Sequence, residues 1–429
     1  MSEWKAHSIR DIVIGLYDGP HATPPPSEAG PIFLGIGNVS EDGHLDLSDV
    51  RHIAEEDFGN WTKRVTPSAG DIVFTYEATL NRYAIIPEGF RGCLGRRMAL
   101  LRPAPDVVDT QFLFYSFFGR AWRKTIEANR LAGATVDRIP LTRFPDFPIS
   151  LPSLETQRRV ASILGTYDDL IKVNRRRVAV LEEMARGLFE EWFVRFRFPG
   201  HETVPIVDTL DGPIPQGWAW AQLSDLCEPK NGIQTGPFGS QLHQEDYSAE
   251  GVPVTMPKNL INLRIIEAGI ARIPEAIAQS LGRHIMRTGD IVYGRRGDIG
   301  RRAYISKRQD GWFCGTGCLR LRPDPSKAEP RYLFDALGLP ATEGSIKGRA
   351  LGATMPNLSA GVMKAVLVLA PPVALQSSYS AKITSMMDLV ENLVEANVGL
   401  AVSRDLLLPR LISGQLSVAS AERELEAVA

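Results

Sequence analysis

The stretch GDIVF at residues 70–74 returns as GDIVY at residues 289–293, and this repeat organises the rest of the chain. Near the start of each half, WKAHSIRDI at 4–12 parallels WAWAQLSDL at 218–226. At a shift of 219 or 220 positions further matches follow: LLRP at 100–103 with RLRP at 320–323, QFLF at 111–114 with RYLF at 331–334, GAT at 133–135 with GAT at 352–354, and Pro152 and Gln157 with Pro371 and Gln376. A chain of 429 residues is longer than a single core usually grows, so the sequence predicts two domains built on one framework.

Each half begins as a mixed α/β domain and ends in long helices. Short β-rich runs such as IVFTY, RYAII and CLRLR lie between Gly- and Pro-containing turns, and residues 111–130 form a predicted helical interlude. After Pro152 and Pro371 the chain keeps a sustained helical period. The predicted divisions are a first globular domain at 1–150, a first long-helix region at 151–198, a Pro- and Gly-rich linker at 199–217, a second globular domain at 218–369, a second long-helix region at 370–418 and a C-terminal tail at 419–429.

Both helical regions carry a heptad seam, with residues spaced alternately three and four positions apart. The first seam is Leu164, Tyr167, Ile171, Asn174, Val178, Leu181, Ala185, Leu188 and Trp192, and the second is Ile383, Met386, Val390, Leu393, Asn397, Leu400, Arg404, Leu407 and Leu411. We therefore predict an α+β protein with an internal pseudo-twofold repeat, in which the long helices pair as an antiparallel coiled coil. The alternative is that each amphipathic helix packs only on its own domain.

Two asparagines interrupt these seams. In an antiparallel pair a layers face d layers, so Asn174 and Asn397 share a layer if the pseudo-dyad passes near residues 176 and 395. The same register pairs Ile171 with Leu400, Leu181 with Val390, Leu164 with Leu407, Leu188 with Ile383, and Arg404 with Tyr167. A buried polar pair selects register and orientation, because a slipped alignment leaves an amide facing hydrocarbon. The alternative is that one or both asparagines lie at a wet edge.

The composition argues against several classes of protein. With 48 Lys and Arg against 50 Asp and Glu, the net charge of −2 argues against a free-standing nonspecific nucleic-acid binder but leaves local basic patches open. No apolar run reaches the ~18 residues of a membrane span and the N-terminus lacks a signal peptide, so we expect a cytoplasmic protein without a membrane partner. Four cysteines fit a reducing compartment, and Cys314 and Cys318 lack a second ligand pair for zinc.

The motifs of the expected catalytic classes are missing. There is no adenine-methylase Asp/Asn-Pro-Pro-Tyr/Phe motif and no phosphate loop, and the GIG at 35–37 is too little for a dinucleotide site. The Pro-Asp pairs have no acidic-x-Lys partner, and the histidines lack metal-ligand spacing. We therefore expect no catalytic residue, no metal and no cofactor bound by this chain. Two alternatives remain: a coiled-coil scaffold with no DNA role, and a single-chain modification enzyme with an unrecognised site.

The positive signal lies in loops that differ between the halves. Residues 293–302, YGRRGDIGRR, place four arginines and three glycines between two strands, which favours contacts to phosphates or guanine edges. The matching loop, FTYEATLNR at 74–82, is far less basic, so the halves are expected to read different targets. The candidate DNA-binding residues are Tyr76, Thr79, Asn81, Arg82, Arg96, Arg97, Lys230, Gln234, Ser240, Gln241, Lys258, Asn259, Arg295, Arg296, Arg301 and Arg302.

Over essentially its whole length the chain resembles the specificity subunit of type I restriction-modification systems. The resemblance rests on the order and duplication of the Trp-led starts, the GDIV strands with their loops, the GAT turns, the Pro-to-Gln helix starts and the IPQGW opening of the second half at 214–218. It implies two target-recognition domains that each read one half of a split DNA site from the major groove, held apart by paired helices. One departure is the sequence YEATLN at 76–81, where the family commonly has a Gly-containing basic loop.

The resemblance also implies partners. These are double-stranded DNA, two adenine methyltransferase subunits that hold S-adenosylmethionine, and restriction subunits driven by ATP with Mg²⁺. With such partners the near-neutral charge is reasonable, because flanking methyltransferases can supply phosphate contacts.

Overall fold

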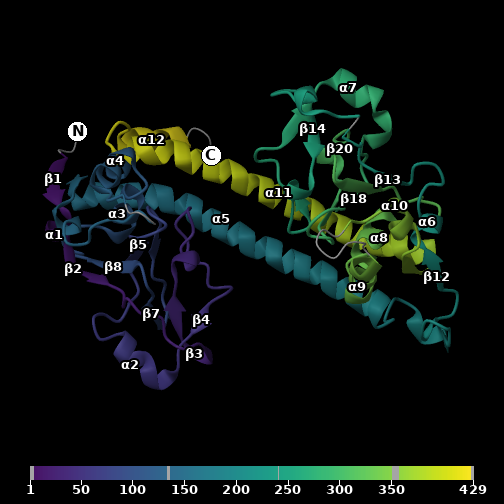
Figure 1. Cartoon of the computed structure of the whole chain (residues 1–429), viewed down its shortest axis with the longest axis horizontal. Coiled ribbons are helices and arrows are strands. Elements are labelled where there is room, and N and C mark those ends of the chain that lie inside the picture. The colour runs from purple at the N-terminus through teal and green to yellow at the C-terminus, as the bar shows by residue number, and fades with distance from the viewer. Residues whose placement is uncertain (1–3, 133–135, 240, 350–356, 427–429) are drawn as a thin grey trace. The chain divides into compact units, whose positions relative to one another are not determined.

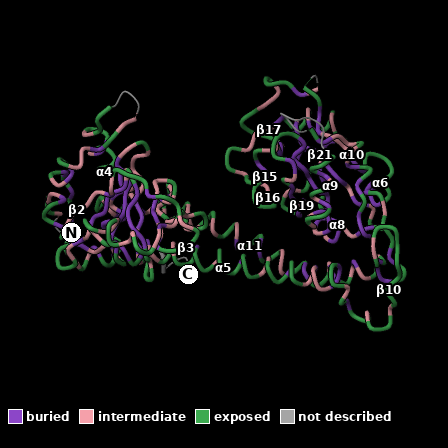
Figure 2. Tube along the Cα trace, turned by 60° about the horizontal axis from the view of Figure 1, so that its bottom comes forward, coloured by how far each residue is buried: buried purple, intermediate pink, exposed green. Residues whose placement is uncertain are grey.

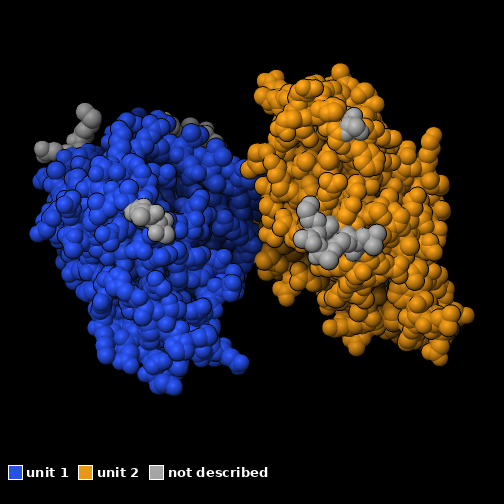
Figure 3. Space-filling view, viewed as in Figure 1, with its two compact units in different colours: residues 1–176, 393–429 blue, residues 177–392 orange. Residues whose placement is uncertain are grey.

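The computed structural model of the chain (Figure 1) describes residues 4–132, 136–239, 241–349 and 357–426. The predicted α+β class is confirmed, because strands, short helices and two long helices are all present. The contacts divide the chain into two compact units (Figure 3): unit 1 is Met1–Arg176 with Leu393–Ala429, and unit 2 is Arg177–Asn392. The end of the chain thus belongs with the first domain. Both GAT turns lie outside the described residues.

Unit 1 contains a four-stranded antiparallel sheet with the strand order β2-β8-β5-β6. A three-stranded sheet, β4-β3-β7, packs with it, and its β3–β7 pair is parallel. The first and last strands of the domain, β1 and β9, pair with each other, so the predicted boundary at residue 150 falls within β9. The strands are β1 (Lys5–Ser8), β2 (Val13–Asp18), β3 (Ser27–Leu34), β4 (Arg51–His52), β5 (Ile72–Thr75), β6 (Tyr83–Ile85), β7 (Gly92–Leu94), β8 (Met98–Pro103) and β9 (Pro148–Leu151).

Unit 2 repeats this topology. Its sheets have the orders β13-β21-β18-β19, β17-β14-β20 and β12-β22, again with one parallel pair, β14–β20. The strands are β12 (Ala219–Gln222), β13 (Ile233–Thr235), β14 (Val252–Thr255), β17 (Ala271–Ile273), β18 (Ile291–Gly294), β19 (Arg302–Tyr304), β20 (Phe313–Cys314), β21 (Cys318–Leu321) and β22 (Leu367–Ala370), with an added hairpin of β15 (Leu260–Ile261) and β16 (Arg264–Ile265). The repeat in the sequence is therefore a repeat of the fold.

Short helices cover these sheets. The predicted helical interlude at 111–130 divides into α3 and α4 at Gly119, whose backbone is extended. The helices are α1 (Ile9–Ile12), α2 (Phe58–Trp61), α3 (Thr110–Ser116) and α4 (Arg120–Asn129) in unit 1, and α6 (Leu223–Leu226), α7 (Glu275–Ser280), α8 (Pro330–Ala336), α9 (Pro340–Arg349) and α10 (Ala360–Lys364) in unit 2. Single 3₁₀ turns are η1 (Ile36–Asn38), η2 (Glu55–Asp57), η3 (Phe144–Asp146), η5 (His201–Thr203), η6 (Gln244–Asp246), η7 (Pro257–Asn259), η8 (Gly282–His284) and η9 (Lys307–Gln309). Figure 2 shows burial concentrated in the strands and in the helices packed on them.

The repeated GDIV motif supplies a buried ion pair that ties neighbouring strands together. In unit 1 Asp71 accepts two hydrogen bonds of 2.8 Å from Arg102, at the end of β8, and one from the Ser68 backbone. In unit 2 Asp290 accepts equivalent bonds of 2.8 and 2.7 Å from Arg322 and one from the backbone of Arg287. Because both carboxylates are buried and fully hydrogen-bonded, the motif repeats for structural reasons.

The repeated glutamines join each domain to its long helix. The buried amide of Gln157 accepts a hydrogen bond of 2.9 Å from the backbone of Asp109 and donates to the Pro152 carbonyl. In unit 2 Gln376 makes the same bonds with Glu329 and Pro371. These bonds fix the direction in which the helix leaves the sheet.

The long helices are α5 (Leu154–Phe189), continued by the π-helical η4 (Glu190–Val194), and α11 (Val373–Ile412). In unit 1 the side chain of Asn174 donates to that of Asn397 at 3.0 Å, which confirms the predicted asparagine layer. Asp168 forms an ion pair with Arg404, so residue numbers fall along α5 as they rise along α11 and the segments are antiparallel. Arg404 was predicted to face Tyr167; it binds the neighbouring Asp168, while Tyr167 packs against the core.

The remaining predicted helix-pairing residues are all at least half-buried. Ile171 and Val390 are buried, and Leu181 and Leu400 are half-buried. In unit 2 Leu188 packs in the same cluster as Ile383.

Two predicted divisions are wrong. The predicted linker at 199–217 is ordered: β10 (Ile206–Val207) pairs with β11 (Ile214–Pro215), and the ring of Phe198 contacts that of Trp218 in the core of unit 2. The predicted tail contains a helix, α12 (Val418–Glu426), whose Val418 and Ala421 are buried in the core of unit 1. The tail helix packs through its own apolar side chains, whereas the segment 199–217 is held by Ile214 and by the flanking Phe198 and Trp218.

Candidate nucleic-acid interface

The loops that differ between the halves gather at one end of each sheet, which we call the loop end. In unit 1 it comprises residues 19–20, 35–38, 76–82 and 95–97, and in unit 2 residues 236–239, 256–259, 294–301 and 315–317. The strand order explains the clustering. β2 and β5 end at the same edge of the sheet at which their antiparallel neighbours β8 and β6 begin. The loops that connect these strands therefore lie together at that edge.

Backbone hydrogen bonds join the loops of unit 1. The Tyr76 amide donates to the Arg97 carbonyl at 3.2 Å, and Gly19 donates to Met98 at 2.8 Å. Residues 76–82 and 95–97 therefore form one surface with the turn after β2.

Unit 2 repeats these bonds at the corresponding positions. The Arg295 amide donates to the Gly317 carbonyl, and Gly236 donates to Cys318, each at 2.9 Å. Pro257, on η7, lies beside Gly294 and Gly317, which brings the neighbouring Lys258 to the same surface.

The two loop ends have positive φ angles at three corresponding positions despite their different sequences. In unit 1 Ala78, Asn81 and Arg97 have φ angles of 68°, 61° and 66°, in the left-handed region. In unit 2 the corresponding residues are Gly297, Gly300 and Gly317, with φ angles of 74°, 117° and 86°. YEATLN thus has positive φ at the two positions where the second loop has Gly297 and Gly300.

The four arginines of the second loop point in two directions. Arg296 and Arg301 are exposed, and Arg301 is paired with Asp298 at 2.7 Å. Arg302 is buried against Phe334, 2.7 Å from Glu343, which contradicts its prediction as a DNA contact because its charge is already paired in the interior. Arg295 is buried and donates to Asn357 at 3.2 Å; burial, and then the neighbouring Arg296, lower its pKa.

Several other predicted residues of unit 2 have structural roles or lie elsewhere. Asn259 is buried and its amide closes the η7 turn by hydrogen bonds to Met256 and Ile266, so it is not a free DNA contact. Lys230 is exposed before β13, at the opposite end of that strand from the loop end.

The glutamines of unit 2 bond locally, and one serine is not described. Gln234 donates to the neighbouring Thr235 carbonyl at 3.0 Å. Gln241 accepts from Phe238 and from Arg283. Ser240 lies outside the described residues. Lys258, Arg296 and Arg301 therefore remain as the exposed cations that the structure brings together.

The predicted residues of unit 1 lie close together but differ in exposure. Tyr76 is buried, and burial raises the pKa of its hydroxyl group. Its buried position contradicts the prediction that its side chain contacts DNA. Thr79 and Asn81 are half-buried in the loop. Arg82 bonds to Glu41 at 3.0 Å and to the Val39 carbonyl.

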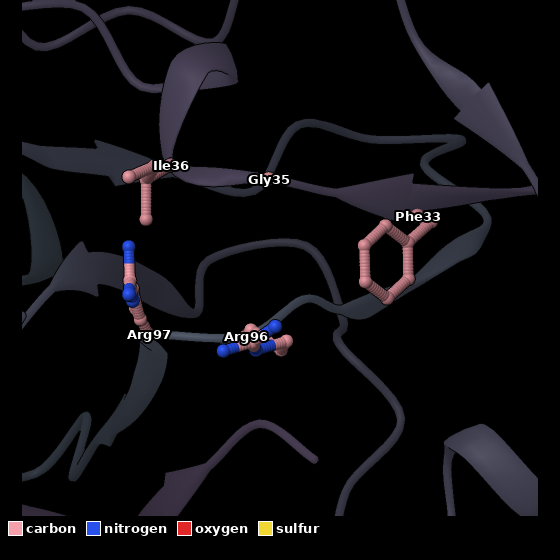
Figure 4. A pocket seen from close by; sticks show the side chains of 5 residues that line it. All are labelled: Phe33, Gly35, Ile36, Arg96 and Arg97. Carbon is pink, nitrogen blue, oxygen red and sulfur yellow. The ribbon is translucent and has the colours of Figure 1, made fainter. Parts of the chain in front are cut away.

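Arg96 and Arg97 line a hollow of about 230 Å³ (Figure 4). Its opposite wall is formed by Phe33, Gly35 and Ile36, and Figure 4 shows Arg97 reaching toward Ile36 with Arg96 between Arg97 and Phe33. The guanidinium group of Arg97 thus faces an apolar side chain, which suits a flat aromatic ring with hydrogen-bond acceptors on its edge.

Sequence reasoning missed two residues of the loop ends. Glu77 forms an ion pair with Arg97, and its Oε1 lies 3.0 Å from Nε without hydrogen-bond geometry. Asn357 holds Arg295. Glu77 is the one acidic residue in YEATLN, and this could have indicated that it pairs with an arginine. No feature of the neighbouring sequence indicates that Asn357 contacts Arg295.

Within the described ranges no three His, Cys, Asp or Glu side chains are grouped to hold a metal, and no helix there is long and apolar enough to cross a membrane. Burial raises the pKa of Cys93 to about 11 and those of Cys227 and Cys314 to about 12, so these thiols are protonated near neutral pH and are poor nucleophiles.

Residues 33–183 match the family model for the type I restriction modification DNA specificity domain. The chain is 24% identical to the specificity subunit of the type I restriction enzyme MjaIX from Methanocaldococcus jannaschii, over 86% of this chain and 82% of the relative. It is 22% identical to the HindI specificity subunit from Haemophilus influenzae, over 97% and 100%. Among solved structures, the S subunit from M. genitalium has a TM-score of 0.61 at 15% identity and covers 96% of each chain, so the fold is shared.

Proposed function

We propose that this chain, which belongs to the family of type I restriction-modification specificity subunits, reads a bipartite DNA site with its two loop ends. Each unit recognises one half-site from the major groove, where every base pair presents a distinct pattern of donors and acceptors. The observation that carries the proposal is the pair of loop ends with matching backbone hydrogen bonds, positive φ at corresponding positions and different side chains. A common framework with divergent loops suits two different half-sites on one duplex.

In this proposal the long helices form an antiparallel coiled coil about a pseudo-twofold axis, and its register sets the spacer between half-sites. The asparagine hydrogen bond between α5 and α11 supports a fixed register, because slippage would leave both amides unpaired.

The chemistry belongs to partner subunits. We propose assembly with two adenine methyltransferase subunits that hold S-adenosylmethionine and with restriction subunits that use ATP and Mg²⁺. The specificity subunit contributes only recognition, and its near-neutral charge leaves much of the phosphate contact to its partners.

Sequencing of methylated adenines in host cells with and without the gene for this chain tests the proposal. We expect methylation of one split motif, two short half-sites around an unspecified spacer, that disappears when the gene is deleted. A methylation pattern that deletion leaves unchanged would reject the proposal. Methyl transfer by the purified chain alone would instead support a single-chain enzyme.

A further inference from the structure

Arg97 lies at a backbone position where the second copy of the framework uses glycine. Its φ of 66° corresponds to 86° at Gly317, and the carbonyls of both residues accept the same hydrogen bond, from Tyr76 and Arg295 respectively. Glycine meets this backbone requirement without strain, whereas an arginine is strained there. Residues with a strained backbone are concentrated at binding sites. The strain at Arg97 therefore indicates that its side chain has a binding role.

The terminal nitrogens of Arg97 are free to bind a ligand. Its side chain is 35% exposed, and neither terminal nitrogen has a partner within the described part of the chain. The guanidinium lies in the hollow of Figure 4, against the apolar side chain of Ile36. An unpaired planar fork beside an apolar wall matches the edge of guanine, which offers two acceptors, O6 and N7, to one arginine.

Glu77 restrains this fork through an ion pair. Its Oε1 lies 3.0 Å from Nε of Arg97, so the pair is made at Nε and not at the terminal nitrogens. The backbone of Glu77 is itself held by a bridge to Arg138. Because this ion pair already restricts the arginine side chain, less conformational entropy is lost when the arginine binds a base.

We propose that Arg97 determines specificity in unit 1 by reading a guanine through O6 and N7, with Glu77 as its positioning residue. This inference rests on the proposed function and assigns one base of one half-site to one side chain. It does not involve Arg82, whose guanidinium is bonded to Glu41 and to the carbonyl of Val39.

The substitution Arg97→Gly tests the inference, because it installs the residue that unit 2 carries. The gene is replaced in the host, and methylated adenines are sequenced. We expect one G·C position in one half-site to become degenerate, with the ratio of methylation at guanine over other bases falling by roughly 5- to 150-fold. The other half-site and the spacer stay unchanged. The melting temperature of the purified variant is expected to equal or exceed that of the wild type, which separates a loss of reading from a loss of folding.

Two further variants complete the test. Arg91→Ala removes another arginine of unit 1 that is paired with a glutamate, Glu55, and is expected to leave the motif unchanged. Glu77→Gln keeps the size of the side chain but removes its charge, and is expected to weaken preference at the same G·C position and nowhere else.

Three results would overturn the inference. They are an unchanged motif in Arg97→Gly, a uniform loss of methylation at all sites in a variant that still folds, and a wild-type motif without a G·C pair in either half. An unchanged motif in Glu77→Gln would remove the positioning role. If the wild type gives no split motif at all, the proposed function fails, and that outcome is distinct from these.

Discussion

The aspartates of the two GDIV motifs form ion pairs with different numbers of arginines. Among the described residues Asp71 is paired with Arg102 alone, whereas Asp290 binds Arg322 and also lies 3.5 Å from Arg320, a guanidinium that is 1% exposed. Strand pairing places Leu100 at the position that corresponds to Arg320, because each lies opposite the central valine of its GDIV strand. Burial lowers the pKa of Arg320, so its charge depends on Asp290 for compensation.

We predict that Asp290→Ala lowers the free energy of unfolding by about 3–5 kcal/mol, because it leaves a buried arginine without a counter-charge. Arg320→Leu, which copies unit 1, is expected to be neutral or stabilising by up to about 3 kcal/mol. Urea denaturation of the full chain measures both. Asp71→Ala is the matched control and should cost less, since the Arg102 side chain is 32% exposed and water can solvate it. Equal damage from Arg320→Leu and Asp290→Ala would contradict this account.

Ala78 gives a second prediction at this scale. It is exposed and left-handed, where unit 2 has Gly297. Ala78→Gly should stabilise the chain by about 0.5–1 kcal/mol, because relief of roughly 1–2 kcal/mol of strain exceeds the added entropy of the unfolded chain. Asn81→Gly should gain less, since asparagine tolerates this conformation. Thermal unfolding compares the two variants, and a lower melting temperature for Ala78→Gly would show that the loop is not strained.

Individual site residues were only partly predictable from the sequence. The loops could be located, because divergent segments between matching strands are visible in the repeat. The direction of each arginine could not: Arg295 and Arg302 turn inward toward Asn357 and Glu343, partners 62 and 41 positions away. Asn259 looked like an exposed amide, yet its side chain closes its own turn.

At the scale of elements, the heptads made the helices predictable over their whole length. Periodicity is a local property, and the two asparagines fixed one register among several. The ion pair between Arg404 and Asp168 was missed because Asp168 lies one position off the seam, where side chains reach around the helix rather than into the layer.

A double substitution tests the hydrogen bond between Asn174 and Asn397. Asn174→Leu alone should cost about 1–2 kcal/mol, because the amide oxygen of Asn397 loses its donor beside a new apolar side chain. Asn174→Leu with Asn397→Leu should recover at least the wild-type stability, at the expense of a less specified register. Urea midpoints of the three proteins test this. Additive destabilisation in the double variant would mean that the amides do not interact.

At the scale of the whole molecule, the sequence predicted two copies of one framework but misplaced parts that depend on distant packing. The C-terminal segment belongs to unit 1 because Leu416 and Ala421 pack in the core of that unit. No local sequence pattern indicates this distant contact. The segment 199–217 has the composition of a linker, but the flanking Phe198 and Trp218 draw it onto unit 2. Proline and glycine content therefore indicated turns, not disorder.

We propose that each unit reads its half-site independently of the other. Replacement of the first domain by that of a relative tests this most directly, with the exchange ending at Pro152 so that β1 and β9 are transferred as a pair. Methylated adenines are then sequenced in cells that carry the chimaera in place of the natural chain. We predict that one half of the split motif changes to that of the donor, while the other half and the spacer are retained. A chimaera that folds and changes both halves, or neither, would contradict the account.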